Sequence, residues 1–208
     1  MIRAVICDFG GVLTTPLGNA FAAWSKESGV PLEALGAAMG KATEDYGGEH
    51  PLFMLERGEL TEVQFLERLQ AAMPAEHDLD GMFDAWWRNL ERNPEMIELM
   101  RDLGGRGLRV ALLTNNVREW EPRWRPMLPE LDEVFELVVD SGFVGIRKPE
   151  RGIYELTLER LGGDVAASEC LFVDDMELNC DAARELGMTA VQFHDTEQAR
   201  TEIEAVLA

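Results

Sequence analysis

The chain has 208 residues, 46% of them hydrophobic, and its 19 Lys and Arg against 39 Asp and Glu give a formal net charge of −20. This length and apolar content suffice for one buried core with a smaller appended lobe, and they argue against a disordered chain. The charge disfavours nucleic acid as a partner, since phosphate backbones need Lys and Arg, and the lack of a run of about 18 apolar residues predicts no membrane partner.

The first predicted element is a buried strand over residues 2–7, which ends in Asp8 and leads into a turn containing Gly10 and Gly11. The carboxyl end of a parallel strand is where open α/β sheets bind their ligands, so Asp8 is a candidate nucleophile or metal ligand. An acid two positions later would be the natural proton donor, but the chain has Gly10 there.

Residues from about 16 to 90 contain no convincing strand. Their pattern predicts helices over 18–28, 31–45, 61–72 and 79–91, with breaks at 47–51 and 73–74. A mainly helical insertion directly after the first strand predicts a small cap domain, 16–90, over the strand ends. The Trp86-Trp87 pair and Met54 within it are interpreted as core packing.

From about residue 94 onward, predicted strands alternate with predicted helices. The strands are 108–113, 137–139, 170–173 and 189–193, and the helices are 94–103, 149–161 and 176–186. This alternation requires right-handed crossovers and therefore a parallel sheet with helices on both faces. The prediction is a Rossmann-like α/β core formed by residues 1–15 and 91–208, with the helical cap inserted after its first strand.

Two features predict a cytoplasmic protein. Residues 1–3 lead straight into a core strand, a pattern unlike a cleavable signal peptide. The three cysteines fit a reducing compartment, and two of them, Cys7 and Cys170, lie in or beside apolar strands, where a small buried thiol is the default.

Polar residues of complementary types follow four separate segments, namely Asp8, then Thr114 and Asn115, then Lys148, then Asp174 and Asp175. In a parallel sheet all of them converge on one edge. Singly, each has an ordinary explanation, because a strand-end Asp or Thr often caps the next helix and Lys148 suits a solvated loop. The adjacent carboxylates of Asp174 and Asp175 are harder to explain, because they repel each other unless a cation or hydrogen-bond donors offset them.

The order of these motifs resembles the haloacid dehalogenase-like hydrolase superfamily. The resemblance covers nearly the whole chain, with DFGGVL at 8–13, LLTNN at 112–116, GFVGIRKPERGIY at 142–154 and FVDDMELNCDAARELGM at 172–188. The last two segments look most like the phosphatase domain of soluble epoxide hydrolases and related bacterial sugar-phosphate phosphatases.

The resemblance implies a role for each strand-end residue. Asp8 matches the nucleophile that forms an aspartyl-phosphate, Thr114 the hydroxyl that binds a phosphoryl oxygen, and Lys148 the ammonium that neutralises phosphate and nucleophile. Asp175 matches a direct Mg²⁺ ligand, Asp174 its neighbour acting through water, and Asn179 a residue that orders that loop. The Gly10 carbonyl matches a further metal ligand, and the cap matches the part that selects the substrate.

Elementary chemistry supports this set. Phosphoryl transfer needs positioning and charge stabilisation, and attack by a carboxylate divides it into two displacements. Mg²⁺ prefers oxygen ligands and keeps several waters, so a few carboxylates suffice. The N–H groups of the turn at Gly10 and Gly11 can cradle phosphate oxygens, and Asn115 is assigned to the same substrate-binding set. The expected substrate is a small phosphorylated metabolite.

Gly10 departs from the superfamily pattern, whose second acid protonates the leaving alcohol and then activates water. Loss of this acid–base assistance predicts a reaction rate ~10²–10⁴-fold lower, unless a substrate hydroxyl, a metal-bound water or a cap residue takes over the role. His50, Glu49, Glu56 and Arg57 are the candidates from the cap, and each is more typical of a surface residue.

Three functions compete. The leading one is a magnesium-dependent phosphatase. A metal-independent 2-haloacid dehalogenase also uses an aspartate and lacks the second acid, but it has little use for Asp174 and Asp175. A catalytically reduced domain that binds a ligand or partner protein rests on Gly10 alone. The oligomeric state is open, and Trp120 and Trp124 fit either a surface patch or packing against the cap.

Overall fold

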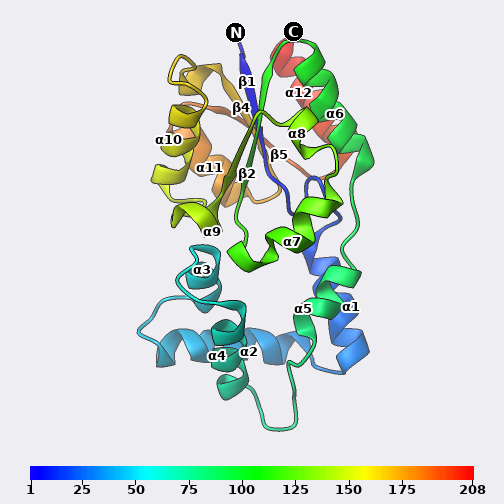
Figure 1. The fold of residues 1–208 in the computed structure, drawn as a ribbon, viewed down its shortest axis with the longest axis vertical. Helices are drawn as coiled ribbons and strands as arrows, with labels where there is room; N and C mark the ends of the chain where they lie inside the picture. Colours follow the sequence, from blue (N-terminus) through cyan, green and yellow to red (C-terminus); the bar gives the residue numbers. More distant parts are fainter.

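The computed structural model describes all 208 residues, and its centre is a parallel five-stranded sheet in the order β3-β2-β1-β4-β5 (Figure 1). The strands are β1 (Ala4–Cys7), β2 (Arg109–Thr114), β3 (Leu137–Asp140), β4 (Cys170–Asp174) and β5 (Thr189–Gln192). β1 and β4 are buried along their whole length, as expected for strands covered on both faces. The predicted α/β fold and all five predicted strands are confirmed.

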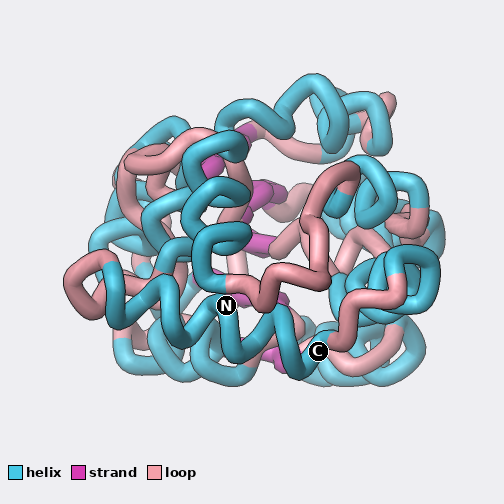
Figure 2. The backbone as a smooth tube through the Cα atoms, turned by 90° about the horizontal axis from the view of Figure 1, so that it is seen from below, coloured by secondary structure: helices cyan, strands magenta, loops and turns pink.

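Helices cover both faces of this sheet (Figure 2). Val5 and Cys7 of β1 face a core that includes residues of α6 (Pro94–Gly105) and α12 (Thr196–Leu207). Ala4 and Ile6, which point the other way, join residues of α10 (Arg151–Arg160) and α11 (Glu177–Glu185) in a second core. This alternation follows from the two-residue period of a strand.

Between β1 and α6 the chain forms five helices and no strand. They are α1 (Leu17–Ser28), α2 (Leu32–Asp45), α3 (Pro51–Glu56), α4 (Glu62–Ala72) and α5 (Met82–Arg88). Figure 1 shows this helical insertion beyond the carboxyl ends of the strands, away from the two termini. Its two connections to the sheet pair with each other at Thr14 and Arg92. That it acts as a cap domain over 16–90 stays a prediction.

Several elements differ from the prediction. α3 lies where only a break was expected, because Pro51 begins the helix instead of interrupting it. α12 was not predicted, although the Asp195 side chain caps it by accepting from the Gln198 N–H. The short helices α7 (Glu121–Trp124), α8 (Leu131–Val134) and α9 (Ser141–Val144) and the 3-10 helices Arg118–Trp120, Arg125–Met127 and Ala167–Glu169 were also missed.

Trp120 and Trp124 are both buried, so the surface-patch interpretation is wrong for them. The Trp120 ring packs on Phe83 of the insertion, 4.7 Å between ring centroids, and the Trp124 ring lies 5.6 Å from that of Phe9. Trp86 belongs to the buried core, as predicted. Nowhere in the structure is a helix both long enough and apolar enough to traverse a bilayer.

Candidate active site

The strand register brings the predicted site residues to one edge of the sheet. Cys7, the last residue of β1, pairs with Leu112 of β2 and with Val173 of β4. Asp8 follows directly, and its N–H donates to the carbonyl of Val173 at 2.9 Å. Asp8 therefore lies level with Asp174, although 166 positions separate the two in the chain.

Lys148 joins this cluster from the loop before α10. Its side chain is 1% exposed, and Nζ donates to Asp8 Oδ1 at 2.7 Å, to Asp174 Oδ2 at 2.6 Å and to the Leu113 carbonyl at 2.9 Å. The loop is held by Asn115, whose Oδ1 accepts from the Lys148 N–H at 2.7 Å and whose Nδ2 donates to the Lys148 carbonyl at 2.9 Å. Lys148 is thus a buried ion-pair partner and no solvated loop cation.

The carboxylates of Asp8, Asp174 and Asp175 offer oxygen atoms that all lie within 4.8 Å of one another. Asp174 is fully buried, and both of its carboxylate oxygens accept hydrogen bonds. Oδ2 accepts from Lys148 Nζ, and Oδ1 accepts from Asn179 Nδ2 and from the Met176 N–H, each at 2.9 Å. No side chain donates to Asp175. The hydrogen-bonding capacity of the Asp174 carboxylate is therefore already used, whereas Asp8 and Asp175 have carboxylate oxygens available to a further partner.

The charges in this cluster do not balance, since one ammonium faces three carboxylates. Burial raises the pKa of Asp8 to about 8, a shift that Lys148 opposes and Asp174 reinforces. Burial and Asp174 raise the pKa of Asp175 to about 6. Burial alone would lower the pKa of Lys148, but Asp174 and Asp8 outweigh it and raise that pKa. An oxygen-rich, under-neutralised cluster of this kind fits a hard divalent cation.

The two turn glycines differ in what they permit. Gly11 has φ of +80°, and a Cβ there would overlap the Asp175 carboxylate, so this position requires glycine. Its N–H donates to Thr14 Oγ1 at 2.9 Å, whereas the Gly10 N–H has no acceptor within the protein. Gly10 does not have a positive φ, and a Cβ there would meet only the flexible tip of Leu17, at 3.1 Å.

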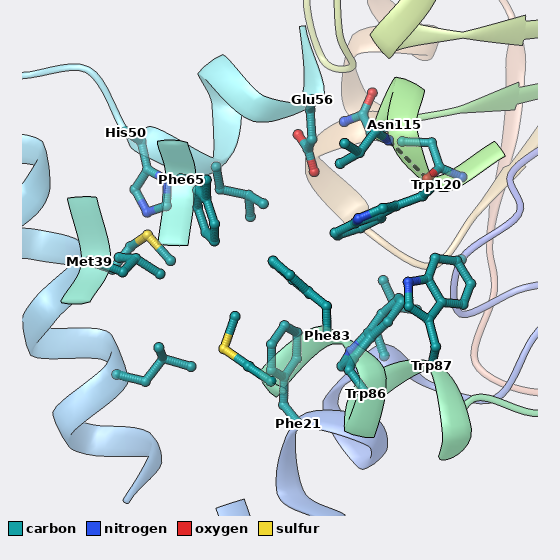
Figure 3. Close-up of a pocket in the computed structure, with 18 of the residues that line it drawn as sticks. Phe21, Met39, His50, Glu56, Phe65, Phe83, Trp86, Trp87, Asn115 and Trp120 are labelled. Atoms are coloured by element: carbon teal, nitrogen blue, oxygen red, sulfur yellow. Dashed lines mark hydrogen bonds between the residues drawn. The ribbon is translucent and has the colours of Figure 1, made fainter. Parts of the chain in front are cut away.

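A cavity of about 380 Å³ extends from this edge of the sheet into the helical insertion (Figure 3). Gly10, Thr114 and Asn115 line its end nearest the strands. The Thr114 side chain is almost completely buried, and no hydrogen bond within the protein engages its hydroxyl. Figure 3 shows the rings of Phe83 and Trp86 along the wall.

Comparison with known proteins decides the family. A family model described as haloacid dehalogenase-like hydrolase matches residues 2–187. The chain belongs to the haloacid dehalogenase-like hydrolases. The predicted resemblance is confirmed, including its link to epoxide hydrolase, since the chain is 25% identical over 220 residues to bifunctional epoxide hydrolase 2 of Sus scrofa. That alignment covers 99% of this chain but only 39% of the relative's length.

This haloacid dehalogenase-like hydrolase is similar to two further proteins over most of their lengths. It is 29% identical over 198 residues to the sesquiterpene phosphatase astK of Aspergillus oryzae, an alignment that covers 93% of this chain and 91% of the relative. The crystal structure of family enzyme bt-2542 from Bacteroides thetaiotaomicron, in complex with magnesium and inorganic phosphate, has a TM-score of 0.68 at 22% identity, covering 92% and 94% of the two chains. At that identity the structural match shows the shared fold.

The insertion contains charged residues that sequence reasoning placed at the surface. The Glu56 and Arg57 side chains are only 14% and 13% exposed, so that assignment is wrong for both. Glu56 Oε2 accepts from Arg147 Nε at 2.6 Å, and Arg57 pairs with Glu49, which does lie exposed.

Two further residues, one in the cavity wall and one bonded to Glu56, were misjudged or missed. His50, assigned to the surface, is half-buried and lines the cavity together with Glu56. Arg147 was not singled out, and the only signal for it is its position beside Lys148 in the motif at 142–154.

Proposed function

We propose that this haloacid dehalogenase-like hydrolase is a magnesium-dependent phosphatase that acts on a small phosphorylated metabolite through an aspartyl-phosphate on Asp8. The observation that carries the proposal is the buried Asp8–Lys148 contact beside two more carboxylates. A cluster with this excess of negative charge suits a cation and a phosphoryl group together, whereas a dehalogenase needs neither. The names of the similar sesquiterpene phosphatase and of the magnesium–phosphate complex support it.

The chain's own residues suit each step of this reaction. Lys148 and the Phe9 N–H both donate to Oδ1 of Asp8, which fixes the carboxylate and leaves Oδ2 without a protein donor. Attack by a carboxylate oxygen forms the Asp8 O–P bond and breaks the bond from phosphorus to the leaving alcohol. Water then attacks the phosphorus, restores the Asp8 carboxylate and releases inorganic phosphate. The free hydroxyl of Thr114 is available to a phosphoryl oxygen throughout.

The metal would be held by the carboxylates of Asp8 and Asp175 and the carbonyl of Gly10. Asp174 would stand behind them, because its oxygens already accept from Lys148, Asn179 and a backbone N–H. Mg²⁺ supplies positive charge between the nucleophile and the phosphoryl oxygens, which would otherwise repel each other.

A parallel titration tests the proposed function against its alternatives. The purified protein, stripped of metal with EDTA, is assayed with p-nitrophenyl phosphate and with 2-chloropropionate while Mg²⁺ is added back. We expect phenolate release that rises and saturates with Mg²⁺, and no chloride release. Chloride release without metal would establish the dehalogenase instead. If neither compound gave a product, the catalytically reduced domain that binds a ligand or partner protein would be the function supported.

Replacing Asp175 by Asn should weaken Mg²⁺ binding by at least about tenfold, since a charged oxygen ligand becomes neutral. In metal-free buffer the same change should raise the melting temperature, because one of three mutually repelling carboxylates is gone. Calorimetric titration with Mg²⁺ and thermal unfolding in EDTA give both values. A variant that binds Mg²⁺ as tightly as the wild type would remove Asp175 from the ligand set.

Gly10 should make the rate depend strongly on the leaving group. p-Nitrophenolate departs without a proton, whereas an alkoxide needs one, so alkyl phosphates should react far more slowly than aryl phosphates. Gly10→Asp should raise the alkyl-to-aryl rate ratio by at least about tenfold, since the backbone accepts a side chain there. Gly18→Asp, which adds the same charge in open space nearby, serves as the control.

The Gly10→Asp comparison counts only if the variant binds Mg²⁺ like the wild type, which calorimetry establishes first. An unchanged alkyl-to-aryl ratio in a variant with normal metal affinity would show that the proton already comes from another group.

A further inference from the structure

We propose that the substrate of this site is a phosphate monoester with a large hydrocarbon body of roughly 10–15 carbon atoms. This body carries at most two or three oxygens, and a sugar phosphate is a poor substrate. The inference rests on the proposed function, because it names the substrate class of the same site. It is carried by the cavity between the strand ends and the helical insertion.

The wall of this cavity is apolar. Fifteen of its 22 lining residues are hydrophobic, and the only ionisable ones are His50 and Glu56. Figure 3 shows Phe21, Phe65, Phe83 and Met39 around the space. A sugar has a hydroxyl on nearly every carbon, and most of these hydroxyls would lose water in this cavity without gaining a hydrogen-bond partner.

The few polar groups of the wall are mostly engaged already. The Glu56 carboxylate accepts from Arg147, and both ends of the Asn115 amide bond to the backbone of Lys148. The indole N–H groups of Trp86 and Trp87 and the Nδ1 atom of His50 are buried without a hydrogen-bond partner in the protein. These three free groups can satisfy two or three polar atoms of a ligand, which sets the limit on the polarity of the body.

The size of the cavity sets the size of the body. An apolar cavity of about 150 Å³ accommodates benzene, with six carbon atoms, so the 380 Å³ found here corresponds to roughly 10–15 carbons. The cavity is partly open to solvent, and a contiguous apolar surface of this kind is typical of a ligand-binding groove. A space this large that opens onto Gly10 and Thr114 is therefore suited to a ligand whose phosphate lies at the strand ends.

Gly10 and the overall charge fit the same conclusion. Because Gly10 has no side chain, the passage from the phosphate end to the cavity stays open beside Leu17. The net charge of −20 repels anionic substrates at long range, so affinity must come from elsewhere. Burial of a hydrocarbon body supplies binding affinity through the hydrophobic effect and needs no attraction between charges.

The test uses n-alkylphosphonates, which phosphatases do not hydrolyse, from two to twelve carbons. Their binding to the Mg²⁺-loaded wild-type protein is measured by calorimetry and by the fluorescence of Trp86, Trp87 and Trp120 in the wall. We expect affinity to rise about fourfold per added methylene until the cavity is filled, at roughly ten carbons or more. Hydrolysis of decyl phosphate should likewise exceed that of glucose 6-phosphate by more than about a hundredfold in kcat/KM.

A matched pair of variants locates the effect. Phe21→Glu places a charge in the cavity wall from a half-buried position, and Val63→Glu places the same charge on α4 outside the cavity. Phe21→Glu should reduce decylphosphonate affinity more than tenfold and leave ethylphosphonate affinity unchanged, which also shows that the variant is folded. Val63→Glu should change neither.

The outcomes separate this inference from the function on which it rests. Affinity that does not depend on chain length, together with metal-dependent hydrolysis of p-nitrophenyl phosphate, overturns the hydrocarbon body and leaves the phosphatase standing. Chain-length dependence without any hydrolysis overturns the phosphatase and keeps the apolar ligand site. Preference for glucose 6-phosphate over decyl phosphate overturns the inference directly.

Discussion

Replacing Asp8 by Asn should lower the turnover of p-nitrophenyl phosphate at least about a thousandfold, because the amide keeps the shape of the carboxylate but is no nucleophile. Asp181→Asn is the matched control, since it makes the same change on an exposed residue of α11 that pairs only with Arg184. Steady-state assays of both purified variants at saturating Mg²⁺ give the comparison.

The Asp8 variant must also remain folded for the result to count. We expect it to be at least as stable as the wild type in EDTA, because Asp8 contributes to the repulsion among the three carboxylates. Retention of more than a few per cent of wild-type turnover would remove Asp8 as the nucleophile.

The second large effect concerns Lys148. Lys148→Met should abolish activity and also destabilise the metal-free protein by about 3–5 kcal/mol, because Asp8 and Asp174 lose the cation that compensates them in the interior. Urea unfolding in EDTA measures the stability difference. A loss under about 1 kcal/mol would show that the carboxylates find other compensation.

A double variant separates this electrostatic cause from lost packing. Asp174→Asn added to Lys148→Met removes one of the two carboxylates that have lost their cation. The double variant should recover part of the lost free energy of unfolding, with no recovery of activity. If the double variant is less stable than Lys148→Met alone, the destabilisation comes from packing of the lysine stem and not from the uncompensated charge.

The sheet was predictable because its strands are short apolar runs bounded by glycine and charged residues. β1, β2 and β4 are buried along nearly their whole length, so their apolar content alone marks them. The short helices between Arg118 and Val134 were missed because four-residue helices lack a full period of apolar residues. α12 could have been found from Asp195 and Gln198, which stand three residues apart at its start.

The residues that meet at the candidate site were predictable from the sequence, but their detailed contacts were not. Strand-end position and motif order picked out Asp8, Thr114, Lys148 and the Asp174-Asp175 pair, and the structure brings them together. Which oxygens remain free depends on contacts between distant segments, such as Asn115 with the Lys148 backbone, and no local pattern encodes these.

The cavity was beyond sequence reasoning for a related reason. Trp87 and Met39 read as ordinary apolar helix residues, and whether such residues fill a core or line a void depends on how helices of the insertion pack against the sheet. Glu56 and Arg57 were misplaced because charged residues are normally exposed. Glu56 is compensated by Arg147, which lies far along the chain, whereas Arg57 pairs mainly with its neighbours Glu49 and Glu59.

The most direct test of the central claim is detection of the phosphorylated nucleophile. The Mg²⁺-loaded protein is mixed with p-nitrophenyl phosphate, quenched in acid within the first turnover, and its peptides are examined by mass spectrometry. The account predicts a phosphoryl group on Asp8 that appears only with Mg²⁺ and is absent from Asp8→Asn. Phenolate release through a full turnover with the phosphoryl group on a different residue, or with Asp8 unmodified at every quench time, would contradict it.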